Sequence, residues 1–536
     1  MIMNKCHLIF WIFLGALAVT PTSRGEISSA ETGKIGRQVA GYRRDGTGIF
    51  PDCSPPTRDL KTQWATELPS WGHSSPITIS SATSGPARVY LTVEPLEGKR
   101  DFPALICVDG SSGKILWDKP LDHLAAVPVA DREPARSAWH EIMADYAKRQ
   151  QFRRDYSKSK DASAMEAAGY KWNTRWGKVI AKDETMIEAK LKIARKAGFT
   201  LETWRHLAGG GGTMCVGAAY ATPVSDGHFI WTTTAWGGFF CHDLDGNQLW
   251  VAFAPGTPGE YCRNGRSPIL WKNLLLSDIT AQARAFDAAT GKLLWSHPVG
   301  DSTIVSPMVL TSGGKDILWA AGCIAFLLPE GTPLTVEGWK DCGMQTLVKY
   351  DERDVIFFCG SGEHCGWTDK GGVKSEFTPP AAVRFALTGS ALQSTVLWNG
   401  KTTGVSTGGT MPWMLYYDKG FYHIDGAILD PLTGAVRTGA TSNKKTRAGN
   451  PAASVPPTSH LLLTAGGHVY GLMTKGLLSV FTTGGQKVSE YKIPVPIATS
   501  NLGWDDKSFC IVGPPFTLGK DRIYARSNIH LLSIGN

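Results

Sequence analysis

The chain has 536 residues, of which 42% are hydrophobic and 19% charged, and this balance excludes a chain too polar to fold around a core. Sixty Gly, 31 Pro and 19 Trp indicate many turns packed with aromatic side chains. The net charge of +8 is uneven, because residues 131–206 contain 17 Lys/Arg and 11 Asp/Glu while the remaining chain is nearly neutral. A solvated helical surface explains this excess better than an acidic partner does.

The N-terminus is typical of an export signal. Lys5 precedes an apolar run over residues 6–19, which is shorter than a membrane span, and Glu26 fits the first residue of a mature chain. We therefore predict a signal peptide over residues 1–25 and a secreted or periplasmic protein. No later stretch of the sequence is long and apolar enough to cross a bilayer.

A repeat of strand, glycine turn and tryptophan recurs along the chain. Its clearest copies are FDAATGKLLW at 286–295, VDGSSGKILW at 108–117 and HDLDGNQLW at 242–250. An Asp or Thr in the turn bonds the local backbone, Gly supplies the positive φ that the reversal needs, and Trp can wedge between neighbouring sheets. Repetition at this scale predicts stacked antiparallel β units.

Each repeat contains four short strands, so we predict an all-β fold, an eight-bladed β-propeller, with seven blades as the alternative. The last unit starts near residue 508 and supplies only three strands. We expect residues 62–68 to supply its fourth strand, which closes the ring and removes the exposed sheet edges. The predicted division is a lead-in over 26–61, blade one with the closing strand over 62–122, an insertion over 123–206, and the remaining blades over 207–536.

The insertion interrupts the repeat between blades one and two. Residues 137–160 and 184–199 read as helices, the second with Ile187, Leu191 and Ala194 on one face. The insertion joins the outer strand of blade one to the inner strand of blade two, so it lies on one end face of the disc. Two interpretations stay open: a lid or docking module over the central funnel, and a helical hairpin that covers a blade surface.

The clearest repeat has the pattern D-x-x-T-G-K-x-L-W, carried by Asp287, Thr290, Gly291, Lys292, Leu294 and Trp295. This pattern resembles the repeat of the PQQ-like (pyrroloquinoline quinone) β-propeller superfamily. That superfamily includes the quinoprotein alcohol dehydrogenases and the propeller component of the bacterial outer-membrane assembly machinery. The resemblance extends over residues 62–536 apart from the insertion, and RRDGTGIFPD at 43–52 resembles the lead-in of secreted propellers from environmental bacteria. It implies the fold, whereas a fold of this kind does not specify a function.

The resemblance raises the question of a bound cofactor. Quinoprotein dehydrogenases of the superfamily usually carry two adjacent cysteines against PQQ, and they hold Ca²⁺ with acidic and amide oxygens. No two cysteines are adjacent in this chain, and no compact set of calcium ligands can be assigned. We expect no cofactor, no metal site and no catalytic residue, with PQQ and calcium as the alternative.

The most concentrated polar cluster is CGSGEHCGW at 359–367. Glu363 and His364 can form an acid–base pair or contribute to a metal site. A surface loop pinned by a disulfide between Cys359 and Cys365 is the favoured interpretation, because closely spaced cysteines of exported proteins commonly pair.

Two tryptophans extend this candidate site. Trp236 is predicted in the loop between the second and third strands of blade two, and Trp367 ends the cluster just described. Together they can line an aromatic site for a sugar, a peptide or a flat ligand, although such a tryptophan more often packs against an adjacent blade. The predicted ligand-binding set is therefore Trp236, Glu363, His364 and Trp367.

These observations favour a secreted propeller that binds a ligand or protein and has no chemistry of its own. A rigid disc presents many loops on one face, which suits binding of a protein or glycan on the end face that carries the insertion. Nucleic acid is not expected as a partner. The alternatives are a PQQ-dependent quinoprotein oxidoreductase acting on alcohols or sugars, and a polysaccharide hydrolase or lyase built on the propeller funnel.

Overall fold

The computed structural model describes much of the chain after the predicted signal peptide. The described residues are 35, 37–80, 87–95, 99–173, 178–182, 218–254, 266–299, 306–339, 344–350, 353–359, 381–400, 415–417, 420–422, 428–438, 461–472, 476–494, 516–527 and 529–536.

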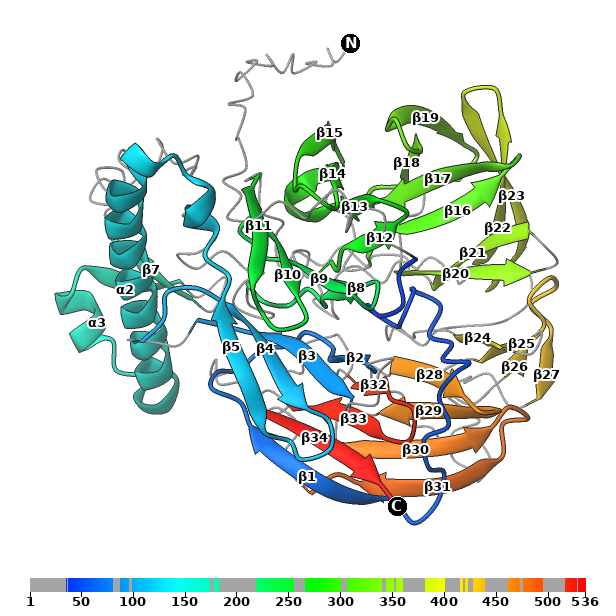
Figure 1. Ribbon diagram of the computed structural model, residues 1–536, viewed down its shortest axis with the longest axis horizontal. Helices are drawn as coiled ribbons and strands as arrows, with labels where there is room; N and C mark the ends of the chain where they lie inside the picture. The colour runs from blue at the N-terminus through cyan, green and yellow to red at the C-terminus, as the bar shows by residue number, and fades with distance from the viewer. Residues whose placement is uncertain are drawn as a thin grey trace, which may run out of the picture.

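The described strands form eight four-stranded antiparallel units arranged around a common centre, and we number these units as blades one to eight (Figure 1). Blade one consists of β2 (Ile77–Ile79), β3 (Arg88–Val93), β4 (Ala104–Asp109) and β5 (Ile115–Pro120); blade two of β8 (Val224–Ser225), β9 (Phe229–Thr233), β10 (Gly238–Asp243) and β11 (Gln248–Phe253); and blade three of β12 (Ile269–Trp271), β13 (Leu274–Ser277), β14 (Gln282–Asp287) and β15 (Leu293–Pro298). Blade four consists of β16 (Met308–Ser312), β17 (Lys315–Ala320), β18 (Ile324–Leu327) and β19 (Thr332–Glu337); blade five of β20 (Met344–Tyr350), β21 (Arg353–Cys359), β22 (Ala381–Thr388) and β23 (Ala391–Asn399); and blade six of β24 (Leu415–Tyr417), β25 (Gly420–Tyr422), β26 (Ile428–Leu429) and β27 (Val436–Thr438). Blade seven consists of β28 (Leu461–Ala465), β29 (His468–Leu472), β30 (Leu477–Thr482) and β31 (Lys487–Lys492), and blade eight of β32 (Phe516–Leu518), β33 (Ile523–Arg526), β34 (His530–Gly535) and β1 (Lys61–Glu67).

The predicted all-β propeller fold is confirmed, and its first and last described strands pair as expected. β1 pairs antiparallel with β34, from Lys61 opposite Gly535 to Glu67 opposite His530. The first described strand therefore completes the last blade. One pairing was not foreseen: β19 of blade four lies parallel to β23 of blade five, so these two blades share one eight-stranded sheet.

Tryptophans of the outer strands form the seams between blades. The ring of Trp250, from β11, lies on the turn between β14 and β15 of blade three. A Cβ added at Gly291 in that turn would come within 2.5 Å of the Trp250 ring. The Trp250 indole N–H also donates to the Ala288 carbonyl over 2.9 Å. The same Trp-on-turn contact joins the pairs Trp64 with Gly113, Trp117 with Gly246, and Trp295 with Gly331. The hydrophobic core is accordingly divided among these seams, with each cluster shared by neighbouring blades.

The meander order gives the disc two distinct end faces. Loops between second and third strands, and the connections from one blade to the next, lie on one of them, which we call the insertion face. The lead-in follows the opposite face: Ala40 bridges Ser225 of β8, Ile49 bridges Thr464 of β28, and the Ser54 N–H donates to the Lys520 carbonyl. In Figure 1 it is the dark blue trace that passes between β8 and β28. The lead-in therefore joins blades that lie far apart around the ring.

The insertion is only partly helical. Its main element is α2 (Val129–Ser159), which begins earlier than predicted and continues through Pro134. After α3 (Ser163–Ala167) the chain forms a hairpin of β6 (Tyr170–Asn173) and β7 (Lys178–Ala181), which lies between the two predicted helices and was not predicted. The second predicted helix, 184–199, lies outside the described residues. Within those described, no helix has the length and apolar character needed to cross a membrane.

Candidate functional site

Trp236 lies where the sequence predicts, between β9 and β10 of blade two. Its side chain is 4% exposed, because Trp139 of α2 packs against it with ring centroids 4.7 Å apart and the ring planes at 71°. The Trp139 indole N–H donates to the Asp101 carbonyl, which lies between β3 and β4, over 3.2 Å. The insertion is therefore seated on the second-to-third-strand loops of two blades.

His123 occupies the centre of this aromatic cluster. It opens the 3-10 helix η1 (His123–Ala126) and is completely buried. Its ring stacks on Phe253 at 4.7 Å and makes edge contacts with Trp139 at 5.0 Å and Trp236 at 5.9 Å. Burial, with a smaller contribution from Arg136, lowers the pKa of His123 to about 3. The imidazole is neutral at ordinary pH, which supports a packing role rather than acid–base chemistry.

The other predicted site residues are not placed beside Trp236. Glu363, His364, Cys365 and Trp367 lie outside the described residues, and Cys359 ends β21 with a side chain whose placement is not described. The acid–base pair, the aromatic site and the disulfide therefore stay predictions. Trp236 itself is covered by α2 rather than open to solvent.

Sequence reasoning missed several buried charges on the insertion face. The first is Arg526, which ends β33 of blade eight and is fully buried. Its Nη1 donates to the carbonyls of Ser74 and Thr92 over 3.0 and 2.8 Å, and to the Ser74 hydroxyl over 2.7 Å. All three acceptors belong to blade one, so this guanidinium ties the two blades across the seam where the ring closes.

Glu94 is the second buried charge and directly follows β3 of blade one. It is 4% exposed, and its carboxylate accepts the backbone N–H groups of Ala218 and Ala219 over 2.9 and 2.5 Å. These are the first described residues after the insertion. Burial raises the pKa of Glu94 to about 7, while the two N–H groups and Arg526 act to lower it. The carboxylate that holds the returning chain therefore changes protonation near neutral pH.

Asp278 repeats this arrangement between blades three and four. It directly follows β13, and its Oδ2 accepts the Ala321 N–H over 3.0 Å and lies 3.4 Å from Nη1 of Arg266. Both charged side chains are nearly inaccessible to water. Burial raises the pKa of Asp278, and the positive charge of Arg266 acts in the opposite direction. Glu94, Asp278 and Arg526 all stand at the end of a second strand, and each reaches to the next blade.

A recurring sequence signal was available for this face. A hydroxyl residue followed by proline precedes the first strand of blades one to four, at 75–76, 222–223, 267–268 and 306–307. The Ser75 N–H donates to Thr222 Oγ1, the Thr222 N–H to Ser267 Oγ, and the Ser267 N–H to Ser306 Oγ, over 2.9–3.1 Å. The hydroxyls thus link four blades in series. Their repeat marks the insertion face beside which the buried charges lie.

The described residues assemble no metal centre. Among them, no three or more His, Cys, Asp or Glu side chains come together in a way that would hold an ion. The buried carboxylates of this face, Glu94 and Asp278, already accept backbone N–H groups from neighbouring segments. These two carboxylates therefore already hold neighbouring segments of the chain in place.

Comparison with known proteins gives a likeness of fold. No protein-family model matches the chain, and no curated protein matches it in sequence. Among solved structures, it is similar to the quinohemoprotein alcohol dehydrogenase from Comamonas testosteroni, with 11% identity, a TM-score of 0.45, and coverage of 97% of this chain and 83% of that one.

Two further solved structures share this likeness. A europium-containing methanol dehydrogenase has 9% identity and a TM-score of 0.38, with coverage of 95% of this chain and all of that one. BamB from Moraxella catarrhalis has 12% identity and a TM-score of 0.36, with coverage of 59% of this chain and 79% of that one. These structures have PQQ-like β-propeller folds, as the repeat implies, and at such low identity the likeness concerns the fold alone.

Proposed function

We propose that this protein is an exported β-propeller that acts as a binding scaffold and catalyses no reaction itself. The observation that carries the proposal is the seating of the insertion. Trp139 and Trp236 are both buried, with ring centroids 4.7 Å apart, so α2 is fixed to the disc rather than loosely attached. Aromatic pairs of this kind add stability beyond the area they bury.

Further contacts make the seat rigid. The Arg136 guanidinium pairs with Asp122, and the His140 ring bonds the Asp101 carboxylate over 2.7 Å. Glu94 also holds the chain at Ala218 and Ala219, the first described residues after the insertion. A helix whose base is fixed on the propeller projects in a constant orientation, which lowers the ordering cost of binding.

A PQQ-dependent quinoprotein oxidoreductase is the second candidate function, and one observation favours it. Arg526 keeps Nε and Nη2 without a hydrogen-bond partner while fully buried, and the titrating Glu94 contributes to its electrostatic environment. A guanidinium with spare donors suits an anionic group, and a carboxyl with a pKa near 7 suits proton transfer. Such groups are the reason to test for PQQ directly.

Reconstitution separates the two candidates. Purified full-length protein is incubated with PQQ and Ca²⁺, passed over a desalting column, and assayed with an artificial electron acceptor on short alcohols and on sugars. For a binding scaffold we expect no retained quinone absorbance and no turnover. Stoichiometric retention of PQQ together with dye-linked oxidation would overturn the proposal, and Arg526→Lys should then weaken retention.

A further inference from the structure

The charge of the insertion is divided along its length. Residues 129–147 contain two Lys/Arg and four Asp/Glu, whereas residues 148–182 contain ten Lys/Arg and three Asp/Glu. The first part is the one that packs on the propeller, through Ala135, Ala138, Trp139 and Ile142. Within residues 129–182, the excess of positive charge is therefore confined to the part that is not seated on the disc.

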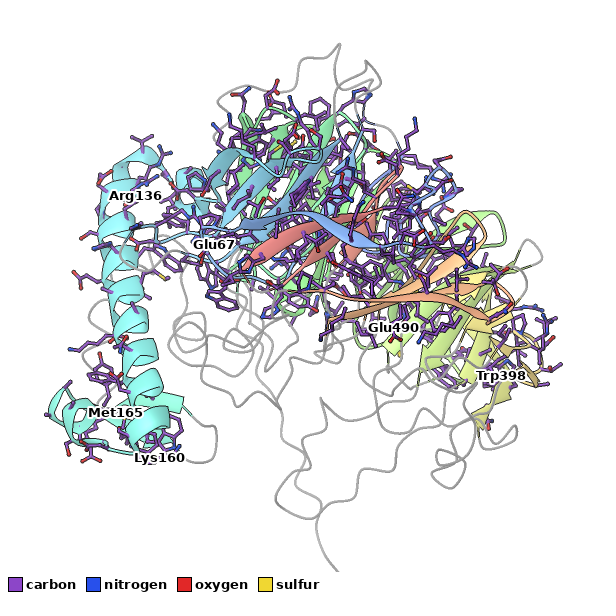
Figure 2. All side chains as sticks on the ribbon, turned by 90° about the horizontal axis from the view of Figure 1, so that it is seen from below. Glu67, Arg136, Lys160, Met165, Trp398 and Glu490 are labelled. Atoms are coloured by element: carbon purple, nitrogen blue, oxygen red, sulfur yellow. The ribbon has the colours of Figure 1, made fainter. Side chains whose placement is uncertain are left out.

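This distal part is a folded unit with its own small core. Met165 of α3, Tyr170 of β6 and Val179 of β7 are buried together, with Phe152 and Tyr156 of α2 packed against them. The Asp145 carboxylate accepts from the Tyr170 hydroxyl and pairs with Arg149, which fixes the hairpin to the helix. A helix of 31 residues is about 45 Å long, so the distal unit stands well clear of the anchor. Figure 2 shows Arg136 level with the sheets, and Lys160 and Met165 at the far end of the helix.

Four lysines of this unit are exposed, and we call them the basic tip: Lys148, Lys160, Lys171 and Lys182. Among the described residues, the ion pairs include none between these ammonium groups and a carboxylate. Lys160 Nζ lies 5.8 Å from the Tyr156 ring centroid, and Tyr156 packs against Trp172 at 4.5 Å. Charge at the tip is therefore not neutralised locally, and half-buried aromatic rings lie directly behind it.

The chemistry of the tip distinguishes among anionic partners. A specific protein interface needs a desolvated anchor, usually an exposed aromatic or large aliphatic side chain. The exposed large hydrophobic residues of the described chain are Val39, Leu116, Val129, Leu293, Leu294 and Val396, and none belongs to residues 148–182. The lysine ammonium group is a point charge. It lacks the planar guanidinium of arginine, which can make paired hydrogen bonds to one carboxylate or one base. Several exposed lysines, with no exposed large apolar side chain among the described residues of this unit, fit a broad anionic surface.

We propose that the basic tip docks the protein on the headgroups of an anionic phospholipid surface. This inference rests on the proposed function, because it names what the scaffold binds. Each lysine near an anionic bilayer adds a favourable increment that falls off within a Debye length, so the attraction is reversible and weakens with salt. Trp and Tyr behind the lysines match the residues that favour the membrane interface.

Vesicle sedimentation tests the proposal on the full-length protein. Vesicles of equal parts phosphatidylglycerol and phosphatidylcholine should bind the protein at 50 mM NaCl and release it at 500 mM, and pure phosphatidylcholine should not bind it. Replacing three tip lysines, in K160Q/K171Q/K182Q, should lower the partition coefficient about 100-fold, since each charge removed accounts for about fivefold. The single variant K171Q should lower the partition coefficient about fivefold. It replaces the triple variant in the test if the triple variant has a lower melting temperature than the wild type.

The matched control removes the same charge from the opposite end face, in K292Q/K315Q/K520Q, whose lysines are also exposed. It should lower partitioning less than twofold. Equal losses in both triple variants would overturn the proposal, because net charge alone would then explain binding. So would tighter binding to duplex DNA or to an acidic protein than to anionic vesicles at the same salt concentration. Neither result depends on the PQQ assay, so the two proposals fail separately.

Discussion

At the scale of single residues, the seams show why glycine and tryptophan recur together. Gly291 has φ of +72°, and its missing Cβ leaves the space that the ring of Trp250 fills. The neighbouring Asp287 carboxylate accepts the backbone N–H groups of Ala289 and Thr290 over 3.1 and 2.8 Å, which holds the turn in shape. The turn therefore reverses the chain and also provides the surface against which Trp250 packs.

Two glycine substitutions separate these roles. Gly313 also has a positive φ, but a Cβ there would meet nothing within 4 Å. We expect Gly313→Ala to lower the free energy of unfolding by about 1 kcal/mol, from backbone strain alone. Gly291→Ala should lower it by about 3 kcal/mol, because overpacking against Trp250 adds to the strain. Chemical denaturation measures both, and equal losses would contradict the tryptophan contact as the reason for Gly291.

At the scale of elements, the insertion is attached to the propeller by contacts of two kinds. α2 is held by buried aromatic rings around His123, which carry no charge at ordinary pH. The chain that returns from the insertion is held by the Glu94 carboxylate through two backbone N–H groups. The buried aromatic contacts around His123 therefore carry no charge at ordinary pH, whereas the hold on the returning chain depends on the protonation of one carboxyl group.

The pH dependence of Glu94 has a definite sign. Its pKa is raised to about 7 by burial, above the ordinary value of 4.5, so the folded protein binds this proton more tightly than the unfolded chain does. The stabilisation from this proton is full below about pH 4.5 and is lost as pH rises to about 7. The free energy of unfolding of the wild type, minus that of Glu94→Gln, should therefore fall between pH 4.5 and 7. A constant difference across that range would show that Glu94 does not titrate there.

At the scale of the whole molecule, two separate devices connect distant parts of the chain. β1 completes blade eight, where Trp64 donates to the Gly110 carbonyl over 3.2 Å and the Thr66 hydroxyl donates to the Gly113 carbonyl over 2.6 Å. The lead-in then joins blades two and seven through the bridges of Ala40 and Ile49. Completion by β1 gives blade eight the same four antiparallel strands as its neighbours, and the propeller is left with only short sheet edges.

The closing seam can be compared with an internal one. Trp64 and Trp295 have the same position in their blades, and both are half-buried on a turn glycine. We expect either Trp→Ala change to lower the free energy of unfolding by about 2–3 kcal/mol. Hydrogen exchange should then differ, with Trp64→Ala accelerating exchange in β1 and β34 and Trp295→Ala leaving them protected. Unchanged protection in both variants would show that the hydrogen bonds of β1 suffice for closure.

Sequence pattern predicted the repeating parts of this protein because they are local. The turn of residues 287–292 needs only a few neighbouring residues, and the alternation of short strands needs only their own side chains. The strand at 62–68 was also predictable, because a last unit of three strands requires a fourth from elsewhere. The start of α2 was predicted too late and the hairpin of β6 and β7 was missed, because the insertion lacks the repeat that guided the other elements.

The sequence by itself therefore determined the propeller, its closure and the place of its interruption. Only the tertiary structure decided what the insertion face contains, because Trp139 and Trp236 are far apart in the chain and meet only once blades one and two are packed. The same holds for Arg526 and Glu94, whose burial comes from neighbouring blades rather than from adjacent residues. Charge was visible in the sequence as a basic segment, but its separation from the anchor depends on the 31-residue helix α2, which carries it away from the disc.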